Sequence, residues 1–410
     1  MLYCVDSEVI DKWSISEGTG VRNNSLEGDK RRIHRRVRRK LITQEENMVE
    51  QKVALVAGAT GLVGNSLLEL LPKSQWKVYG LARRPRPSWF VNTGVEYIEC
   101  DLLDRSDTLR KVSRLTDVTH LFWVVWVHKS DGEEQGNCEA NGSMLSNALD
   151  ALLLNAKQLE HICLQTGSKH YIGPQSLWGK IDHGELPFVE DGPRLGVPNF
   201  YYTLEDIVYD AAKKKKGLTW SIHRPSVIFG FAPRNLINLV HAVAVYASIC
   251  KQQGLPFVFP GHSEAWECKT DVSDAELIAE QQIWAATDAR AKNQAFNVTN
   301  GDLVTWKELW HAVALKFDLQ VPVYSGSPTS MEEILRDKQE VWEEMTRSNR
   351  LHATTNLRKV ARILDEAFNF PFRLVSSNSK CREFGFNGSR DTEASLTRVI
   401  DRMRAARIIP

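Results

Sequence analysis

Gly58-Ala59-Thr60-Gly61-Leu62-Val63-Gly64 is the stretch of sequence that decides the fold. It follows the short apolar run Val53–Ala57, which is typical of a buried strand. It precedes a helical segment that we expect from about Gly64 to Leu71, just before Pro72. Three glycines in this spacing between a strand and a helix indicate a loop that holds the pyrophosphate of a dinucleotide.

Each part of this loop has a physical purpose. Gly58 allows the tight turn, Gly61 lets the backbone approach the pyrophosphate, and Gly64 lets the helix pack on the strand. The start of the helix then presents free N–H groups and the positive end of its dipole to the anion.

Further apolar runs alternate with helical segments after this loop, which predicts a Rossmann-type, doubly wound parallel sheet in an α/β protein. The alternation weakens past Gly230, where mostly helical segments are expected to bind the substrate. Ser273 and Glu276 are spaced as a capping box and predict that a helix begins at Ser273. The predicted strands are Lys77–Ala82, Val95–Cys100, Leu121–Val127, His161–Gln165 and Leu218–Val227; the predicted helices are 138–156, Tyr202–Lys216, Leu236–Lys251, Ser273–Ala286, Trp306–Phe317 and Met331–Arg347.

The first 47 residues differ from the rest of the chain. They contain the run Lys30–Lys40, in which eight of eleven residues are Lys or Arg, and charge blocks of this kind are usually disordered. We therefore expect residues 1–47 to be a disordered basic leader, residues 48–230 the dinucleotide-binding domain, and residues 231–410 the helical region.

Composition excludes several other classes of protein. The net charge is +1, so the total gives no reason to expect a nucleic-acid partner. No apolar run reaches the length of a membrane span. Seven scattered cysteines with no Cys-x-x-Cys pair argue against a disulfide framework or a zinc site and favour a reducing, cytoplasmic location.

The residues after the second predicted strand indicate which dinucleotide binds. Enzymes that use NAD place Asp or Glu there to bind the ribose hydroxyls, whereas this chain has Arg83 and Arg84. Guanidinium groups suit a 2′-phosphate, so the sequence predicts NADPH. Asp101, after the third predicted strand, would suit the adenine end of the cofactor.

The usual Tyr-x-x-x-Lys motif of short-chain reductases is absent, because Glu205 stands four residues after Tyr201. The chain instead resembles the plant progesterone 5β-reductase and iridoid synthase family, which are atypical short-chain dehydrogenases/reductases that reduce the carbon–carbon double bond of enones. The resemblance runs from about Val53 to Asp302 and rests on the motifs Gln165-Thr166-Gly167-Ser168-Lys169-His170-Tyr171, Asn199-Phe200-Tyr201-Tyr202, His223-Arg224-Pro225 and Ile228-Phe229-Gly230-Phe231.

The resemblance implies that Lys169 and Tyr201 are catalytic. It implies that hydride from NADPH adds to the β-carbon of an enone while Tyr201 holds the oxygen on which charge builds. Trp126 and Phe200 flank these motifs and are expected to line the substrate pocket. The cofactor contacts that the resemblance implies, together with the glycines of the loop, are Gly58, Thr60, Gly61, Leu62, Gly64, Arg83, Arg84, Asp101, Leu102, Val125, Gln165, Tyr201 and Ile228.

Two departures from the family pattern affect these expectations. Val125 stands where the family usually has Thr before Trp126, which removes a polar contact to the cofactor. The segment around residues 350–390 also departs, and it bears on the outer wall of the pocket.

Two other functions remain open at this level: an NADP-dependent carbonyl reductase or epimerase of the extended short-chain type, and a non-catalytic regulator that senses NADP. We expect a small apolar enone as the partner, with no nucleic acid, no membrane and no metal, and we leave a homodimer open.

Overall fold

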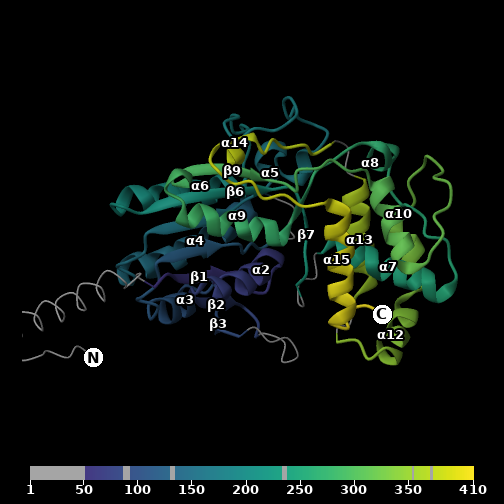
Figure 1. Cartoon of the computed structure of the whole chain (residues 1–410), viewed down its shortest axis with the longest axis horizontal. Coiled ribbons are helices and arrows are strands. Elements are labelled where there is room, and N and C mark those ends of the chain that lie inside the picture. The colour runs from purple at the N-terminus through teal and green to yellow at the C-terminus, as the bar shows by residue number, and fades with distance from the viewer. Residues whose placement is uncertain (1–50, 86–92, 130–133, 233–237, 353–354, 370–372) are drawn as a thin grey trace, which may run out of the picture. The chain divides into compact units, whose positions relative to one another are not determined.

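The predicted phosphate loop joins β1 (Val53–Ala57) to α2 (Leu62–Leu70) at the centre of a parallel sheet in the computed structural model (Figure 1). Element labels follow that figure. The structure describes residues 51–85, 93–129, 134–232, 238–352, 355–369 and 373–410. The predicted leader, residues 1–47, lies outside them. Lys52–Pro410 form one unit of the chain.

The sheet has seven strands in the order β3-β2-β1-β4-β5-β6-β9, and every neighbouring pair is parallel. This is the Rossmann strand order with one strand added beyond β6. A separate parallel pair is formed by β7 and β8. The strands after β1 are β2 (Lys77–Ala82), β3 (Val95–Glu99), β4 (His120–Trp123), β5 (His161–Gln165), β6 (Thr219–Pro225), β7 (Val227–Phe229), β8 (Val272–Asp274) and β9 (Gln294–Val298).

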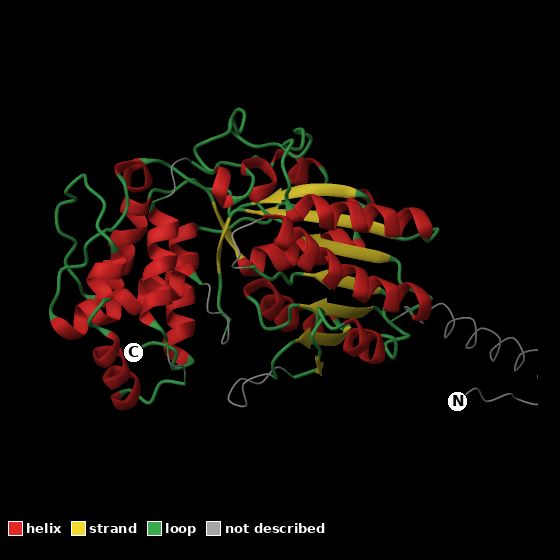
Figure 2. Ribbon diagram, turned by 180° about the vertical axis from the view of Figure 1, so that it is seen from behind, coloured by secondary structure: helices red, strands yellow, loops and turns green. Residues whose placement is uncertain are grey.

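Helices cover both faces of the sheet, as Figure 2 shows. One face packs in a common core with α3 (Arg105–Val112), α4 (Glu134–Asn155) and α6 (Phe200–Lys214). The other packs with α2 and α9 (Ala275–Thr287). Because both faces are covered, strands such as β1 and β4 are buried along their whole length and read as continuous apolar runs.

A second core holds the helical part of the chain together and contains residues of α7, α10, α13 and α15. In Figure 2 the arrowheads of the central strands point toward this helical group, which is the end of the sheet where ligands bind in open α/β folds. The four helices are α7 (Leu239–Gln253), α10 (Trp306–Phe317), α13 (Leu357–Phe368) and α15 (Thr392–Ala405).

Shorter elements complete the described part of the chain. They are α5 (Lys169–Ile172), α8 (Ser263–Glu267), α11 (Met331–Leu335), α12 (Gln339–Ser348), α14 (Ser379–Glu383), η2 (Pro72–Ser74), η3 (Gln175–Leu177) and η4 (Ala289–Ala291). Across the described ranges, no helix combines the length and apolar character that a membrane span needs.

The predicted fold class is confirmed, but several predicted boundaries are wrong. Asp274, not Ser273, caps α9 by accepting from the N–H groups of Glu276 and Leu277. Ser273 lies in β8, and its hydroxyl donates to the carbonyl of Val298. The serine therefore ties β8 to the main sheet instead of starting a helix.

The predicted strand Leu121–Val127 ends early, and the predicted helix Met331–Arg347 is broken. Beyond Trp123 the chain leaves the sheet, and the Asn141 side chain satisfies both the N–H and the carbonyl of Val127. The segment predicted as one helix over Met331–Arg347 forms two separate helices, α11 and α12. The side chain of Gln339 forms hydrogen bonds with the backbone that leads into α13.

The division between domains at residue 230 remains a prediction. Two elements from beyond residue 230 pack with the predicted dinucleotide-binding domain. β9 joins its sheet beside β6, and α9 packs against α2.

Candidate active site

The phosphate loop has the steric properties that the glycine spacing predicts. Gly58 has φ of +98°, and a Cβ there would lie 2.9 Å from the backbone of Val124. A Cβ on Gly64 would lie only 2.1 Å from the carbonyl oxygen of Gly58, so any larger residue would push α2 away from the turn. Gly61 closes that turn by donating to the Gly58 carbonyl at 2.9 Å.

The N-terminus of α2 lies at this loop and has no side chain as a cap. No acidic residue occupies its first turn, so its amide groups and positive dipole end suit an anion. Thr60 and Gly61 are partly exposed there, whereas Leu62 is buried and can offer only its backbone. The loop also lies at the reversal of strand order between β1 and β4, where dinucleotides bind in this fold.

The residues expected at the adenosine end follow β2 and β3. Arg83 and Arg84 directly follow β2 and are both exposed. Asp101 follows β3, and its carboxylate accepts from the N–H of Leu103 at 3.1 Å. Leu102 is buried, and its carbonyl accepts from Asn147 at 2.9 Å. The two arginines are therefore exposed cationic side chains directly after β2, where they could meet a phosphate.

The remaining expected cofactor contacts come from β4, β5 and β7. Val125 is partly buried just beyond the end of β4. Gln165 ends β5 and accepts from Gln282 at 3.2 Å. Ile228 is partly buried in β7. Their contacts with a cofactor stay predictions, although all three lie at or near the ligand-binding end of the sheet.

Tyr201 lies in the first turn of α6, which begins at Phe200 and not at the predicted Tyr202. A Cβ on Gly167 would lie 3.0 Å from its hydroxyl oxygen, so the hydroxyl lies beside the segment that follows β5. Within the described residues it has no hydrogen-bond partner. Burial raises the pKa of Tyr201, and the negative charge of Glu134 raises it further. The tyrosine therefore stays protonated at neutral pH, with a hydroxyl free to donate.

Lys169 is the first residue of the short helix α5, two residues beyond Gly167. Its ammonium nitrogen lies 5.9 Å from the centre of the Trp178 ring. Burial lowers the pKa of Lys169, and the carboxylates of Glu134 and Glu366 partly offset this effect. The negative charge of Glu134 thus raises the pKa of both predicted catalytic residues.

The two residues predicted to line the substrate pocket stack on one another. The rings of Trp126 and Phe200 are 6.1 Å apart and inclined by 15°, and the ring of Phe200 is 4.3 Å from that of Tyr201. Trp126 is 46% exposed, whereas Phe200 is buried. Trp126 can therefore contact a ligand directly, whereas the buried Phe200 packs against the Tyr201 ring.

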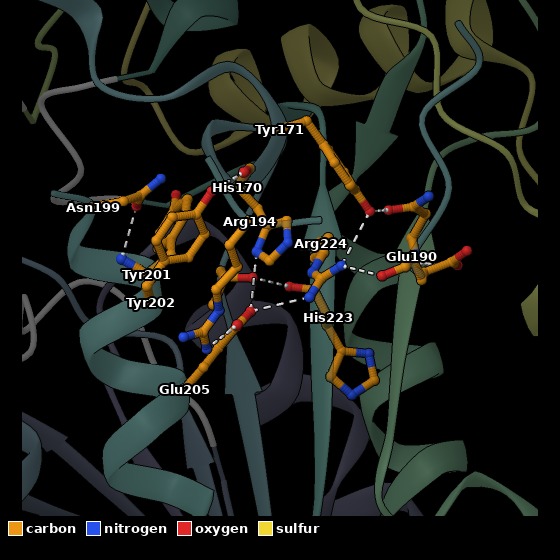
Figure 3. Close-up of polar contacts among 12 residues, drawn as sticks. His170, Tyr171, Glu190, Arg194, Asn199, Tyr201, Tyr202, Glu205, His223 and Arg224 are labelled. Atoms are coloured by element: carbon orange, nitrogen blue, oxygen red, sulfur yellow. Dashed lines mark hydrogen bonds and ion pairs between the residues drawn. The ribbon is translucent and has the colours of Figure 1, made fainter. Parts of the chain in front are cut away.

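Glu205 occupies the place where an ordinary short-chain reductase has its lysine, and it is the centre of a buried ion cluster (Figure 3). Its carboxylate oxygens lie 2.8 Å from Arg194 and 3.2 Å from both Arg224 and His170. Burial alone would raise the pKa of Glu205, but His170 and the two arginines outweigh it and lower the pKa to about 2. The carboxylate is thus ionised and fully engaged.

Sequence reasoning assigned no role to Asn199 or Glu134. The sequence carries one signal for Asn199, because an asparagine directly before Phe200 is typical of a helix cap. Glu134 gave no signal in the sequence. Its carboxylate accepts from the Phe200 N–H at 2.9 Å and from Asn137 at 3.1 Å.

Solved structures share this fold at low sequence identity. A UDP-glucose 4-epimerase matches with a TM-score of 0.62 and 14% identity, covering 86% of this chain and 98% of that one. An epimerase from Methanothermobacter thermautotrophicus matches with a TM-score of 0.61 and 17% identity, covering 87% and 93%. These structures share the Rossmann fold of this chain, and the more similar relatives that follow place it among oxidoreductases of the short-chain dehydrogenase/reductase class.

The family model described as PRISE-like Rossmann-fold domain matches residues 79–410, and the chain belongs to this family. An (S)-8-oxocitronellyl enol synthase of Camptotheca acuminata is 53% identical over 88% of this chain and 94% of its own length. A 3-oxo-Δ4,5-steroid 5β-reductase of Arabidopsis thaliana is 45% identical over 91% and 97%. The resemblance seen in the sequence motifs is thereby confirmed.

Proposed function

We propose that this protein is an NADPH-dependent reductase of the carbon–carbon double bond of enones, with Tyr201 and Lys169 stabilising the enolate. The observation that carries the proposal is the protonated hydroxyl of the partly buried Tyr201, which no described residue engages and which lies beside Gly167, two residues before Lys169. Two relatives support it: one is an enol synthase, and the other is a 5β-reductase of 3-oxo-Δ4,5-steroids, which are themselves enones.

The protein's own groups would act on the substrate oxygen. Bound NADPH would supply the hydride. The hydroxyl of Tyr201 would donate a hydrogen bond to the carbonyl oxygen of the enone, and this bond strengthens as negative charge develops there. The Lys169 ammonium would add positive charge near the same oxygen. The α-carbon then needs one proton, which water or a nearby acid can supply.

The ion cluster around Glu205 argues against ordinary carbonyl reduction. Reducing a carbonyl requires a proton for the alkoxide, and the usual Tyr-x-x-x-Lys relay supplies it. Here the residue four after Tyr201 is a carboxylate held by Arg194 and Arg224, so this relay has no lysine at that place.

A regulator that only senses the cofactor would bind NADPH without oxidising it in the presence of small enones, whereas the proposed enzyme oxidises it continuously.

NADPH is proposed as the cofactor because Arg83 and Arg84 are exposed at the end of β2. Changing both to Gln is expected to raise the KM for NADPH by about tenfold or more for each guanidinium lost, since a hydrogen bond to a charged group is worth about 1.5–3 kcal/mol. The KM for NADH, which lacks the 2′-phosphate, should change little. Initial rates with a saturating enone give both constants.

The control for this experiment removes two positive charges from another exposed part of the protein. Lys213 and Lys214 are exposed in the last turn of α6, and the double change to Gln should leave both KM values as they are. Equal use of NADH and NADPH by the unaltered protein would contradict the assignment of the phosphate contact.

We also propose that the protein is located in the cytoplasm. The six cysteines in the described ranges are all free thiols, as expected for a protein of a reducing compartment.

A further inference from the structure

The side chain of Asn199 joins the backbones of the two residues proposed as catalytic. Its Oδ1 accepts from the N–H of Tyr201 at 3.0 Å, and its Nδ2 donates to the carbonyl oxygen of Lys169 at 2.7 Å. Asn199 is only 3% exposed. Figure 3 shows the bond from Asn199 to the start of the helix that carries Tyr201. One amide group therefore spans α5 and α6 at the site.

We propose that Asn199 is a positioning residue, which sets the spacing between Lys169 and Tyr201 and hence the geometry around the substrate oxygen. The inference rests on the proposed function. Asn199 itself is not assigned any contact with substrate or cofactor. It acts through the main chain of its two partners.

Helix capping alone does not account for an asparagine at this position. Ser and Asp cap helices about as well as Asn, and this chain uses Asp274 to cap α9 and Ser330 to cap α11. Among the residues that commonly cap helices at neutral pH, Asn is the one that accepts with one side-chain atom and donates with another. The assignment of the two amide atoms is also fixed, because the Tyr201 N–H needs an acceptor and the Lys169 carbonyl needs a donor.

Glu134 makes the arrangement more rigid. It satisfies the N–H of Phe200, while Asn199 satisfies that of Tyr201, so the first two amides of α6 are held from different parts of the chain. A second bond between α5 and α6 runs from the Tyr202 hydroxyl to the His170 carbonyl at 2.6 Å. Because this bond persists without Asn199, we expect a variant there to stay folded while the Lys169–Tyr201 spacing loosens.

The test uses two variants that keep the cap and lose the bridge, Asn199→Asp and Asn199→Ser. A misplacement of about 1 Å can cost roughly 10²-fold in rate, so kcat with 2-cyclohexen-1-one should fall by about 10- to 100-fold. The Kd for NADPH should not change. Each kcat is divided by the number of NADPH-binding sites found by isothermal titration, so that misfolded protein does not lower it.

Asn356 provides the matched control. It caps α13 by accepting from the N–H groups of Arg358 and Lys359, and it is exposed. Asn356→Asp and Asn356→Ser change an exposed cap and should shift Tm less than the Asn199 variants, which leave the Lys169 carbonyl without its donor; kcat should not change. If the fall in kcat merely follows the fall in Tm, or if both Asn199 variants keep the original kcat, the inference is overturned.

Tyr201→Phe is measured in the same assay to separate two kinds of failure. Slow Tyr201→Phe together with unimpaired Asn199 variants overturns the positioning role alone. Full turnover by Tyr201→Phe overturns the catalytic assignment, and the positioning role with it.

Discussion

Replacing Tyr201 with Phe is expected to lower kcat for enone reduction by about 10²–10³-fold, the usual cost of losing one donor to a developing oxyanion. The change removes only the hydroxyl, which no described residue engages and whose raised pKa keeps it protonated. The aromatic ring stays packed on Phe200. Binding of NADPH should therefore persist, and the loss should appear in turnover.

The effect is measured as NADPH oxidation at saturating 2-cyclohexen-1-one, alongside a titration of NADPH binding. Tyr209→Phe is a matched control, because Tyr209 lies further along the same helix with its ring against Trp220. That variant should turn over normally. A Tyr201→Phe variant whose kcat stays within about threefold of that of the original protein would contradict the expected loss. The tyrosine would then have no part in the mechanism.

Replacing Glu205 with Gln is expected to lower the free energy of unfolding by about 3–5 kcal/mol, the usual cost of removing one partner from a buried ion pair. Glu205 and Arg224 are 1% and 4% exposed. Without the carboxylate, the Arg224 guanidinium keeps its desolvation cost and loses the opposite charge. Urea unfolding at neutral pH measures the difference.

Asp206→Asn is the control for this change. Asp206 neighbours Glu205 and binds the same Arg194 at 2.8 Å, but its side chain is 61% exposed. An exposed pair is worth about 0–1 kcal/mol, so this variant should lose far less. Equal losses from the two variants would show that burial does not matter here.

The loss should also depend on pH. Because the pKa of Glu205 is about 2 in the folded protein and about 4.3 in an unfolded chain, its contribution is fully present above the higher value. It disappears as the pH falls toward the lower one. The difference between the original protein and Glu205→Gln should therefore shrink in acid.

Local patterns predicted the part of the fold that depends on local chemistry. The apolar run Val53–Ala57 and the three glycines after it predicted β1, the turn and α2, because sterics dictate each glycine. β9 (Gln294–Val298) was not predicted. It lies at the edge of the sheet and is short, with the polar residues Gln294 and Asn297 among its five, so its pattern is weak without its partner β6.

The candidate site was likewise predictable from the sequence only in part. Lys169 and Tyr201 were found only through the family's motifs, since neither residue stands out by its chemistry. The role of Glu205 depends on Arg194, Arg224 and His170, which come together only when α5, α6 and β6 pack. A carboxylate on a helix ordinarily faces water, and nothing local to Glu205 indicates that it is buried.

The central claim is that the reaction reduces the carbon–carbon double bond and leaves the carbonyl intact. It is tested most directly by incubating the protein with 2-cyclohexen-1-one and NADPH and identifying the product by mass spectrometry and NMR. Cyclohexanone is the predicted product, because Tyr201 and Lys169 are suited to holding an enolate oxygen and the usual proton relay is replaced by the bound carboxylate of Glu205. An allylic alcohol as the sole product would contradict the account and make this protein an ordinary carbonyl reductase.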